Sequence, residues 1–224
     1  MSLRGQFSTE FLTPIAETQG DIQTIFDIIF CAWATLKIDL PVNLSRNWED
    51  SITFHFYSAI ISEKSRRKQN GHQFAFDFTL FASVFDETQV SDGLPDYGIP
   101  DIQITFRSDE AQRYFFEAKL LNKEGEYLHN QYVSQGMMCF ITGKYGKSVQ
   151  WSGMIGYVLD GNTNKARNKV AMKIENERLT LGMSPTATLN ISTIRKDVYE
   201  TLHMRQTMTP FTIYHVFLPV QRGR

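Results

Sequence analysis

The sequence predicts an α/β protein in which a mixed central sheet is flanked by helices. Residues 98–119 alternate polar and apolar side chains around a polar turn, which is the pattern of an antiparallel hairpin. Residues 151–159 form a continuous apolar run of the kind found in buried parallel strands. Several longer segments, which precede and follow these strands in the sequence, repeat apolar residues at helical spacing. Together these patterns indicate parallel and antiparallel strands in one sheet, with helices packed against it.

The composition is that of a globular protein without a membrane span. The 224 residues suffice to bury a core, and 42% of them are hydrophobic, including 17 phenylalanines. The longest apolar run, Ile28 to Leu36, is too short to cross a bilayer, and nothing at the N-terminus resembles a secretion signal. Cys31 and Cys139 lie in apolar helical patterns, where we expect buried free thiols. This usage favours a reducing cytoplasm and argues against a disulfide scaffold.

The formal net charge of −1 hides an asymmetry between the two halves of the chain. Residues 1–110 contain 8 Lys/Arg and 16 Asp/Glu, a balance of −8, whereas residues 111–224 contain 15 and 8, a balance of +7. The basic half is compatible with a local phosphate-binding surface, although two solvated faces of opposite sign explain it equally well. The total charge excludes a protein that binds nucleic acid by charge alone.

The N-terminal part of the chain predicts an arm followed by two helices. Residues 1–20 read as a loosely packed arm, and a helix then runs from Asp21 to about Leu40, where Pro41 stops it. Its apolar face either joins the core or receives a partner chain. A second helix begins after Ser45 or Asn47 and ends near Ser62.

Two acidic residues, Glu49 and Asp50, lie in the first turn of this second helix, where they complement the helix dipole. The alternative for Glu49 is that it reaches a neighbouring metal site. Residues 62–72 read as a polar loop whose cations, Lys64, Arg66, Arg67 and Lys68, are either solvated or in contact with phosphate. A strand is expected over residues 73–86, followed by a flexible segment that contains Pro95 and Asp96.

The C-terminal half predicts two helices and two strands. A helix over residues 127–142 is capped by Gly143, and a helix over 165–181 carries five cations, Lys165, Arg167, Lys169, Lys173 and Arg178. Residues 183–195 read as a surface loop or irregular edge, residues 197–204 as a short amphipathic segment, and residues 211–220 as a last strand. His203, Arg205 and His215 fall in this region, and we expect each to be a hydrogen-bonded structural residue.

The hairpin gathers three charged residues on one of its faces. In the first strand Asp101 alternates with apolar Ile102, and in the second Glu117 and Lys119 flank Ala118. A turn centred near residue 109 pairs Asp101 with Glu117, and a slip of two residues pairs it with Lys119. Either register keeps the three side chains on one face, whereas a slip of one residue separates them.

Two carboxylates beside an ammonium suit a hard divalent cation and a water nucleophile. Carboxylate oxygens hold Mg²⁺ while leaving positions for water and phosphate, and a lysine can orient or deprotonate the attacking water. The alternative is the ordinary wet face of a half-exposed hairpin. Asp96 competes with Asp101 for the metal role, but we prefer Asp101 because a strand with the required alternation follows it directly.

The order of elements and motifs resembles the PD-(D/E)XK nuclease superfamily, which has the restriction-endonuclease-like fold. The matching positions are Pro100-Asp101, then Glu117-Ala118-Lys119, then Gln135 on the following helix. The segments QYVSQGMMCFITGKYG and SGMIGYVLDG are similar to the helix and strand of bacterial members linked to phage defence and DNA processing. The resemblance covers about residues 45–160 of a single domain; the N-terminal helical arm 1–40 and the C-terminal part 161–224 lie outside it.

The resemblance implies a role for each matching position. Asp101, Glu117 and the carbonyl of Ala118 would bind Mg²⁺ or Mn²⁺, and Glu49 would extend the metal site. Lys119 would position water and stabilise charge on the phosphate, and Gln135 would orient Lys119 or a phosphate.

These implications lead to two functional hypotheses. The first is a cytoplasmic Mg²⁺-dependent endonuclease or exonuclease acting on DNA, within a bacterial antiviral defence or DNA-processing system; an RNA substrate stays open. The second is a non-catalytic or partner-regulated subunit of a larger nucleic-acid-handling complex, whose larger partner could be an ATPase. A homo-oligomer is compatible with both, and neither involves a membrane.

Overall fold

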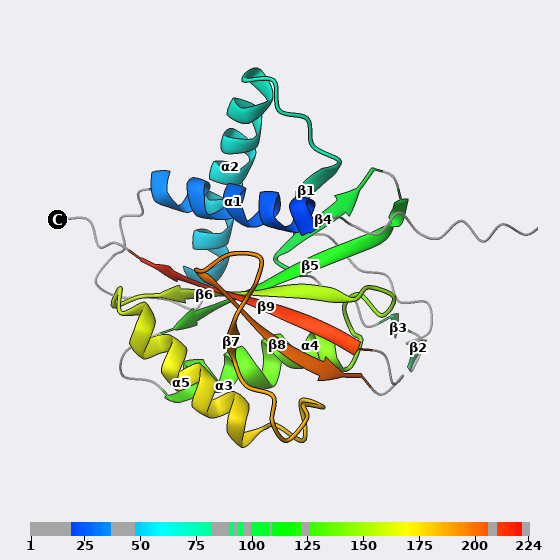
Figure 1. Cartoon of the computed structure of the whole chain (residues 1–224), viewed down its shortest axis with the longest axis vertical. Coiled ribbons are helices and arrows are strands. Elements are labelled where there is room, and N and C mark those ends of the chain that lie inside the picture. Colours follow the sequence, from blue (N-terminus) through cyan, green and yellow to red (C-terminus); the bar gives the residue numbers. More distant parts are fainter. Residues whose placement is uncertain are drawn as a thin grey trace, which may run out of the picture.

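The computed structural model describes residues 19–36, 48–81, 90–91, 94–95, 100–107, 109–121, 126–205 and 210–220. Within these residues seven strands form one mixed sheet in the order β1-β4-β5-β6-β9-β8-β7 (Figure 1). Their bounds are β1 Phe76–Leu80, β4 Ile102–Phe106, β5 Asp109–Leu121, β6 Trp151–Val158, β7 Asn190–Ile191, β8 Val198–Met204 and β9 Pro210–Pro219. A separate antiparallel pair joins β2 Val90–Ser91 to β3 Leu94–Pro95.

The three central strands are parallel, and the outer ones are antiparallel. β5 and β9 both run parallel to β6, whereas β1-β4-β5 and β9-β8-β7 are antiparallel. Every residue of β6 is buried, because helices cover both faces of the sheet at this strand. The predicted buried parallel strand over residues 151–159 is therefore confirmed.

Helices lie on both faces of the sheet (Figure 1). On one face, α1 Gln19–Thr35 sets Phe26 against Phe116 and stacks Trp33 on Tyr157, and α2 Trp48–Gln69 packs beside α1. On the other face lie α3 Glu126–Gln131, the π-helix η1 Tyr132–Met137, α4 Met138–Ile141 and α5 Thr163–Asn176. The predicted class, an α/β protein with a mixed sheet between helices, is confirmed.

Helix α2 extends seven residues beyond the predicted end at Ser62, so the expected polar loop over 62–72 is wrong for most of its length. Glu63 accepts hydrogen bonds from both Arg66 and Arg67, one turn further along the helix, and these pairs support the polar turns. Lys64 is buried and donates to the carbonyl of Phe76 and to Asp77. Lys64 is therefore a structural residue, and the alternative of a phosphate contact is wrong for it.

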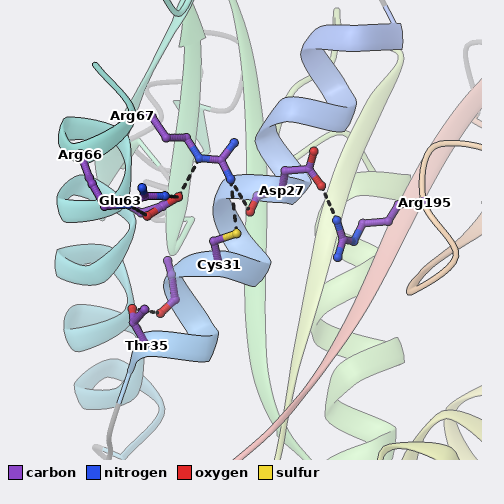
Figure 2. A network of polar contacts seen from close by, with 8 residues as sticks. Asp27, Cys31, Thr35, Glu63, Arg66, Arg67 and Arg195 are labelled. Carbon is purple, nitrogen blue, oxygen red and sulfur yellow. Dashed lines mark hydrogen bonds and ion pairs between the residues drawn. The ribbon is translucent and has the colours of Figure 1, made fainter. Parts of the chain in front are cut away.

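A polar network joins α2 to α1 and to the segment before β8 (Figure 2). The Arg67 guanidinium donates to the Asp27 carbonyl at 3.2 Å and to Cys31 Sγ at 3.3 Å, and Arg195 pairs with the Asp27 carboxylate. Cys31 is exposed, which corrects the expectation of a buried thiol, whereas Cys139 is partly buried. The face of α1 that carries Asp27 and Cys31 is thus in contact with the Arg67 and Arg195 side chains.

The bounds of the C-terminal elements differ less from the predicted ones. α5 ends at Asn176, and a turn with Gly182 at φ +62° replaces the last helical residues expected up to 181. Residues 198–204 form β8, because they pair along their full length with β9. The arm before residue 19, residues 37–47 and 82–89, and Asp96 lie outside the described residues. No helix among the described residues is long and apolar enough to cross a membrane.

Candidate active site

The hairpin of β4 and β5 has the even register on which the charged cluster depends. Ile102 lies opposite Phe116, so Asp101, the residue just before β4, is aligned with Glu117. A register shift between Thr105 and Phe106 lies at the far end of the hairpin and leaves this alignment unchanged. The predicted sharing of one face by Asp101 and Glu117 is confirmed.

This face is buried, which rules out the alternative of a wet hairpin surface. Asp101 is only 7% exposed and Glu117 only 8% exposed. The Ala118 N–H donates to Asp101 Oδ2 at 2.6 Å, and this bond fixes the aspartate against β5. Burial of two carboxylates costs free energy unless cations or donors compensate them, so their position here needs a physical cause.

Lys119 is the cation that compensates them. Its Nζ donates to Glu117 Oε1 at 2.8 Å, to Glu49 Oε1 at 2.9 Å and to the Ala118 carbonyl at 2.8 Å. The second oxygen of Glu49 accepts the Leu120 N–H at 3.0 Å. Glu49 comes from the first turn of α2, so the helix brings a carboxylate to the end of β5, while the hypothesis that Glu49 reaches a metal stays a prediction. Asp50, its neighbour, is exposed.

The environment shifts the pKa of all three hairpin residues. Burial raises the pKa of Asp101 well above its usual value, and the Glu117 carboxylate raises it further. Burial also raises the pKa of Glu117, although Lys119 opposes this. Burial lowers the pKa of Lys119, but Glu117, Glu49 and Asp101 outweigh it, so its pKa lies above the ordinary value. Lys119 is therefore an ammonium at neutral pH.

One oxygen of the cluster is left over. Glu117 Oε2 is buried and has no hydrogen-bond partner among the described residues. An unpaired buried carboxylate oxygen is unfavourable, and hard cations with oxygen ligands satisfy such atoms. Asp101, Glu117 and the Ala118 carbonyl together offer an all-oxygen donor set. Two of these donors are side chains and one is a backbone carbonyl. In the described part of the chain, no group of three His, Cys, Asp or Glu side chains could hold a metal ion.

The π-helix η1 covers the cluster. A Cβ at Gly136 would lie 2.4 Å from Met154 Cε and 3.6 Å from Glu117 Cγ, so η1 lies directly against these two side chains, and a larger residue at 136 would require Met154 to move. Gln135, the residue before it, is exposed, and its side chain makes no bond to Lys119 or Glu117 within the described residues. Its proposed role toward Lys119 or a phosphate stays a prediction. A single π-helical turn is frequent at functional sites.

Two residues near the cluster, Lys144 and Tyr145, were missed by sequence reasoning. The Lys144 ammonium lowers the pKa of Glu117, and burial and the Glu117 charge both raise the pKa of Tyr145. The Tyr145 N–H donates to the Cys139 carbonyl on α4 at 3.0 Å. The available signal was Gly143, whose φ of +76° turns the chain back toward the sheet directly before Lys144. His203 and His215 are buried, and both make hydrogen bonds within the core, as expected of structural residues.

The chain was compared with protein-family models, curated proteins and solved structures. None of the three comparisons gives a match. Geometry and chemistry alone therefore carry the functional interpretation.

Proposed function

We propose that this protein is a metal-dependent nuclease that hydrolyses phosphodiester bonds in DNA. The observation that carries the proposal is the buried cluster of Asp101, Glu117 and Lys119, in which Glu117 Oε2 has no hydrogen-bond partner among the residues that the structure describes. Burying carboxylates and a lysine together costs free energy and shifts their pKa values, and such shifted groups are frequent at functional sites.

The topology supports the restriction-endonuclease-like assignment. α2 is followed by the antiparallel strands β1, β4 and β5, then by the helices α3 to α4, and then by β6 parallel to β5. This is the order that the resemblance implies: a helix with an acidic residue, a strand, the hairpin, a second helix and an apolar strand. The charged cluster lies on the hairpin, as the same resemblance requires.

A divalent cation fits the donor set of Asp101, Glu117 and the Ala118 carbonyl. When bound, Mg²⁺ or Mn²⁺ would act as a Lewis acid on the phosphate and would increase the acidity of a water molecule. Burial raises the pKa of both Asp101 and Glu117, and the Glu117 carboxylate raises that of Asp101 further; added positive charge would favour their ionised forms. The metal role that the resemblance gives to Glu49 stays a prediction, because both Glu49 oxygens already accept hydrogen bonds.

Lys119 acts as a cation rather than as a base. Its raised pKa keeps it protonated, so it cannot remove a proton from water at neutral pH. As an ammonium it can hold a phosphate oxygen or a water and stabilise the charge that develops during hydrolysis. Glu49 holds Lys119 in position through the bond between Glu49 Oε1 and Nζ.

Plasmid cleavage tests the proposal. Purified protein with Mg²⁺ or Mn²⁺ should nick or linearise supercoiled DNA, whereas Glu117→Gln and Lys119→Met should abolish cleavage and keep the wild-type circular dichroism spectrum. Glu175→Gln serves as the matched control, because Glu175 is an exposed carboxylate of α5 far from the hairpin in sequence, and it should cleave like wild type. Equal cleavage by all four proteins would refute the assignment.

A partner-regulated subunit is the second candidate. Lys119 neutralises Glu117 and Glu49 within the chain itself, which is the arrangement expected of a site held inactive. β8 also exposes the apolar side chains Leu202 and Met204 at 58% and 43%, as a partner-binding surface would. This candidate predicts that the purified chain binds nucleic acid but cleaves it only after a partner protein is added. Its placement in bacterial defence stays a prediction.

A further inference from the structure

A pocket of about 250 Å³ lies between α5, α1 and the ends of β8 and β9. Its walls include three aromatic rings, and polar side chains stand among them. The residues that matter here are Phe30, Asn164, Arg167, Asp197, Tyr199 and Phe217. The sequence offered no sign of this pocket, because these residues are spread over almost the whole chain.

The sheet register places the pocket relative to Lys119. Lys119 pairs with Gly156 on β6, and Gly156 pairs with Phe217 on β9. Residues aligned across adjacent strands share a face, so Phe217 lies on the Lys119 face, two strands away. Two strand spacings amount to about 10 Å. Phe217 and Pro219 line the pocket at the carboxyl end of β9, and Lys119 lies at the carboxyl end of β5, so both are at the same end of the parallel strands.

The aromatic walls are held in place by neighbouring contacts. The rings of Tyr199 and Phe217 meet edge to face with centroids 5.9 Å apart. Arg167 donates to the Tyr199 hydroxyl at 2.6 Å and lies 5.0 Å from the centre of its ring. On the opposite side Arg195 lies 4.6 Å from the Phe30 ring and pairs with Asp27, as Figure 2 shows. The pocket is thus preformed.

The chemistry of the lining matches a nucleobase. Aromatic rings stack on the flat face of any base, and an arginine beside a ring strengthens such contacts. Asn164, Arg167 and Asp197 supply donors and acceptors of the kind that pair with the polar edge of a base. The volume lies below the 300–1,000 Å³ or so of pockets for drug-sized ligands, so it suits one ring system.

We propose that the pocket receives an unpaired base of the substrate strand next to the phosphate at Lys119. This inference rests on the proposed nuclease function and names its substrate class: single-stranded nucleic acid, or a duplex from which a base is flipped out. A base inside a regular duplex cannot enter such a pocket, because both of its faces are stacked. The basic helix α5 contributes through Arg167, whose guanidinium lines the pocket.

Oligonucleotide binding tests the inference without any cleavage. A fluorescein-labelled single-stranded oligothymidine is titrated with protein in EDTA, and anisotropy gives the Kd. Tyr199→Ala should weaken binding about 5- to 150-fold, since stacking on one aromatic ring is worth roughly 1–3 kcal/mol per base. Tyr199→Phe keeps the ring but loses the hydroxyl bond to Arg167, so it should bind more tightly than Tyr199→Ala. If Tyr199→Ala fails to fold, Tyr199→Leu, which keeps apolar packing, replaces it.

Two controls make the result specific. Lys173→Met removes a cation of the same helix that pairs with Glu177 outside the pocket, and it should bind like wild type. An abasic strand of equal length should bind wild type as weakly as oligothymidine binds Tyr199→Ala. Equal affinity of Tyr199→Ala and wild type for oligothymidine overturns the pocket inference even if the protein cleaves DNA. Ring-dependent binding without Mg²⁺-dependent cleavage supports the pocket and refutes the nuclease proposal.

Discussion

Acidification from pH 7.5 to pH 5 is expected to destabilise the fold by about 2 kcal/mol through His203 alone. His203 belongs to a buried hydrogen-bond chain that also contains Tyr132, His215 and Thr201. The Leu181 carbonyl can only accept, so His203 Nδ1 donates to it at 2.8 Å, and His203 Nε2 accepts from the Thr201 hydroxyl at 2.7 Å. Thr201 then accepts from His215 Nε2 at 2.8 Å, and His215 Nδ1 accepts from the Tyr132 hydroxyl at 3.0 Å. Every proton is assigned, and both imidazoles are neutral.

The magnitude follows from the pKa of His203 in the folded state. Burial lowers this pKa to about 4, whereas the unfolded chain titrates near pH 6.5. Below pH 6.5 the unfolded state therefore binds the proton first, and the free energy of unfolding falls until the pH reaches the folded pKa. At pH 5 the difference amounts to about 2 kcal/mol, and His215, whose pKa burial also lowers well below its ordinary value, adds an effect of the same sign. Asp101 and Glu117 act in the opposite direction, because their folded pKa values are raised.

Urea unfolding followed by tryptophan fluorescence at both pH values measures the effect. His203→Asn keeps a donor for the Leu181 carbonyl but cannot titrate, so it should lose about 2 kcal/mol less than wild type between pH 7.5 and pH 5. His55→Asn is the control at an exposed histidine of α2, and it should follow wild type. If His203→Asn and wild type lose equal stability, the histidine is not held neutral in the way described.

Three further substitutions test separate parts of the structure. Glu49→Gln leaves Lys119 without one of its carboxylates and should slow DNA cleavage roughly 10- to 100-fold, as loss of a supporting partner commonly does; an unchanged rate would contradict its role. Gly153→Ala would set a methyl group 2.1 Å from the buried Phe116 ring, so the free energy of unfolding should fall by about 1–3 kcal/mol or more; an unchanged melting temperature would contradict this packing. Arg205→Met removes a guanidinium whose Nη1 donates to three carbonyls of residues 146–149, and urea unfolding should show a loss of roughly 2–3 kcal/mol; wild-type stability would contradict these bonds.

The parts of the fold that could be predicted are those with a local cause. The alternation around the polar turn was sufficient to place Asp101 and Glu117 on one face, since a slip of one residue would have turned apolar side chains away from the core, but it left two registers open between which the structure decides. The apolar run at residues 151–159 likewise predicted a strand buried on both faces of the sheet, because it carries no polar face for solvent. Gly143 marked a helix end because it takes a positive φ.

The parts that could not be predicted depend on residues distant in sequence. The last turns of α2 look like a solvated loop until Asp77 and the Phe76 carbonyl are brought to Lys64 by β1. Burial of the charged hairpin face depends on η1, whose approach is decided by contacts with Met154 and Glu117. Glu49 meets Lys119 across 70 positions of sequence, so only the packing of α2 beside β5 reveals which of its two possible roles it has.

The central claim is that Asp101 and Glu117 receive a divalent cation, and Mn²⁺ binding tests it most directly. Titration of the wild-type protein with Mn²⁺, followed by the electron paramagnetic resonance signal of the free ion, should show one Mn²⁺ bound per chain. Asp101→Asn and Glu117→Gln should each lose this binding while keeping the wild-type circular dichroism spectrum, and Glu175→Gln should retain it. Absence of Mn²⁺ binding by the wild type, or equal binding by Glu117→Gln, would contradict the claim.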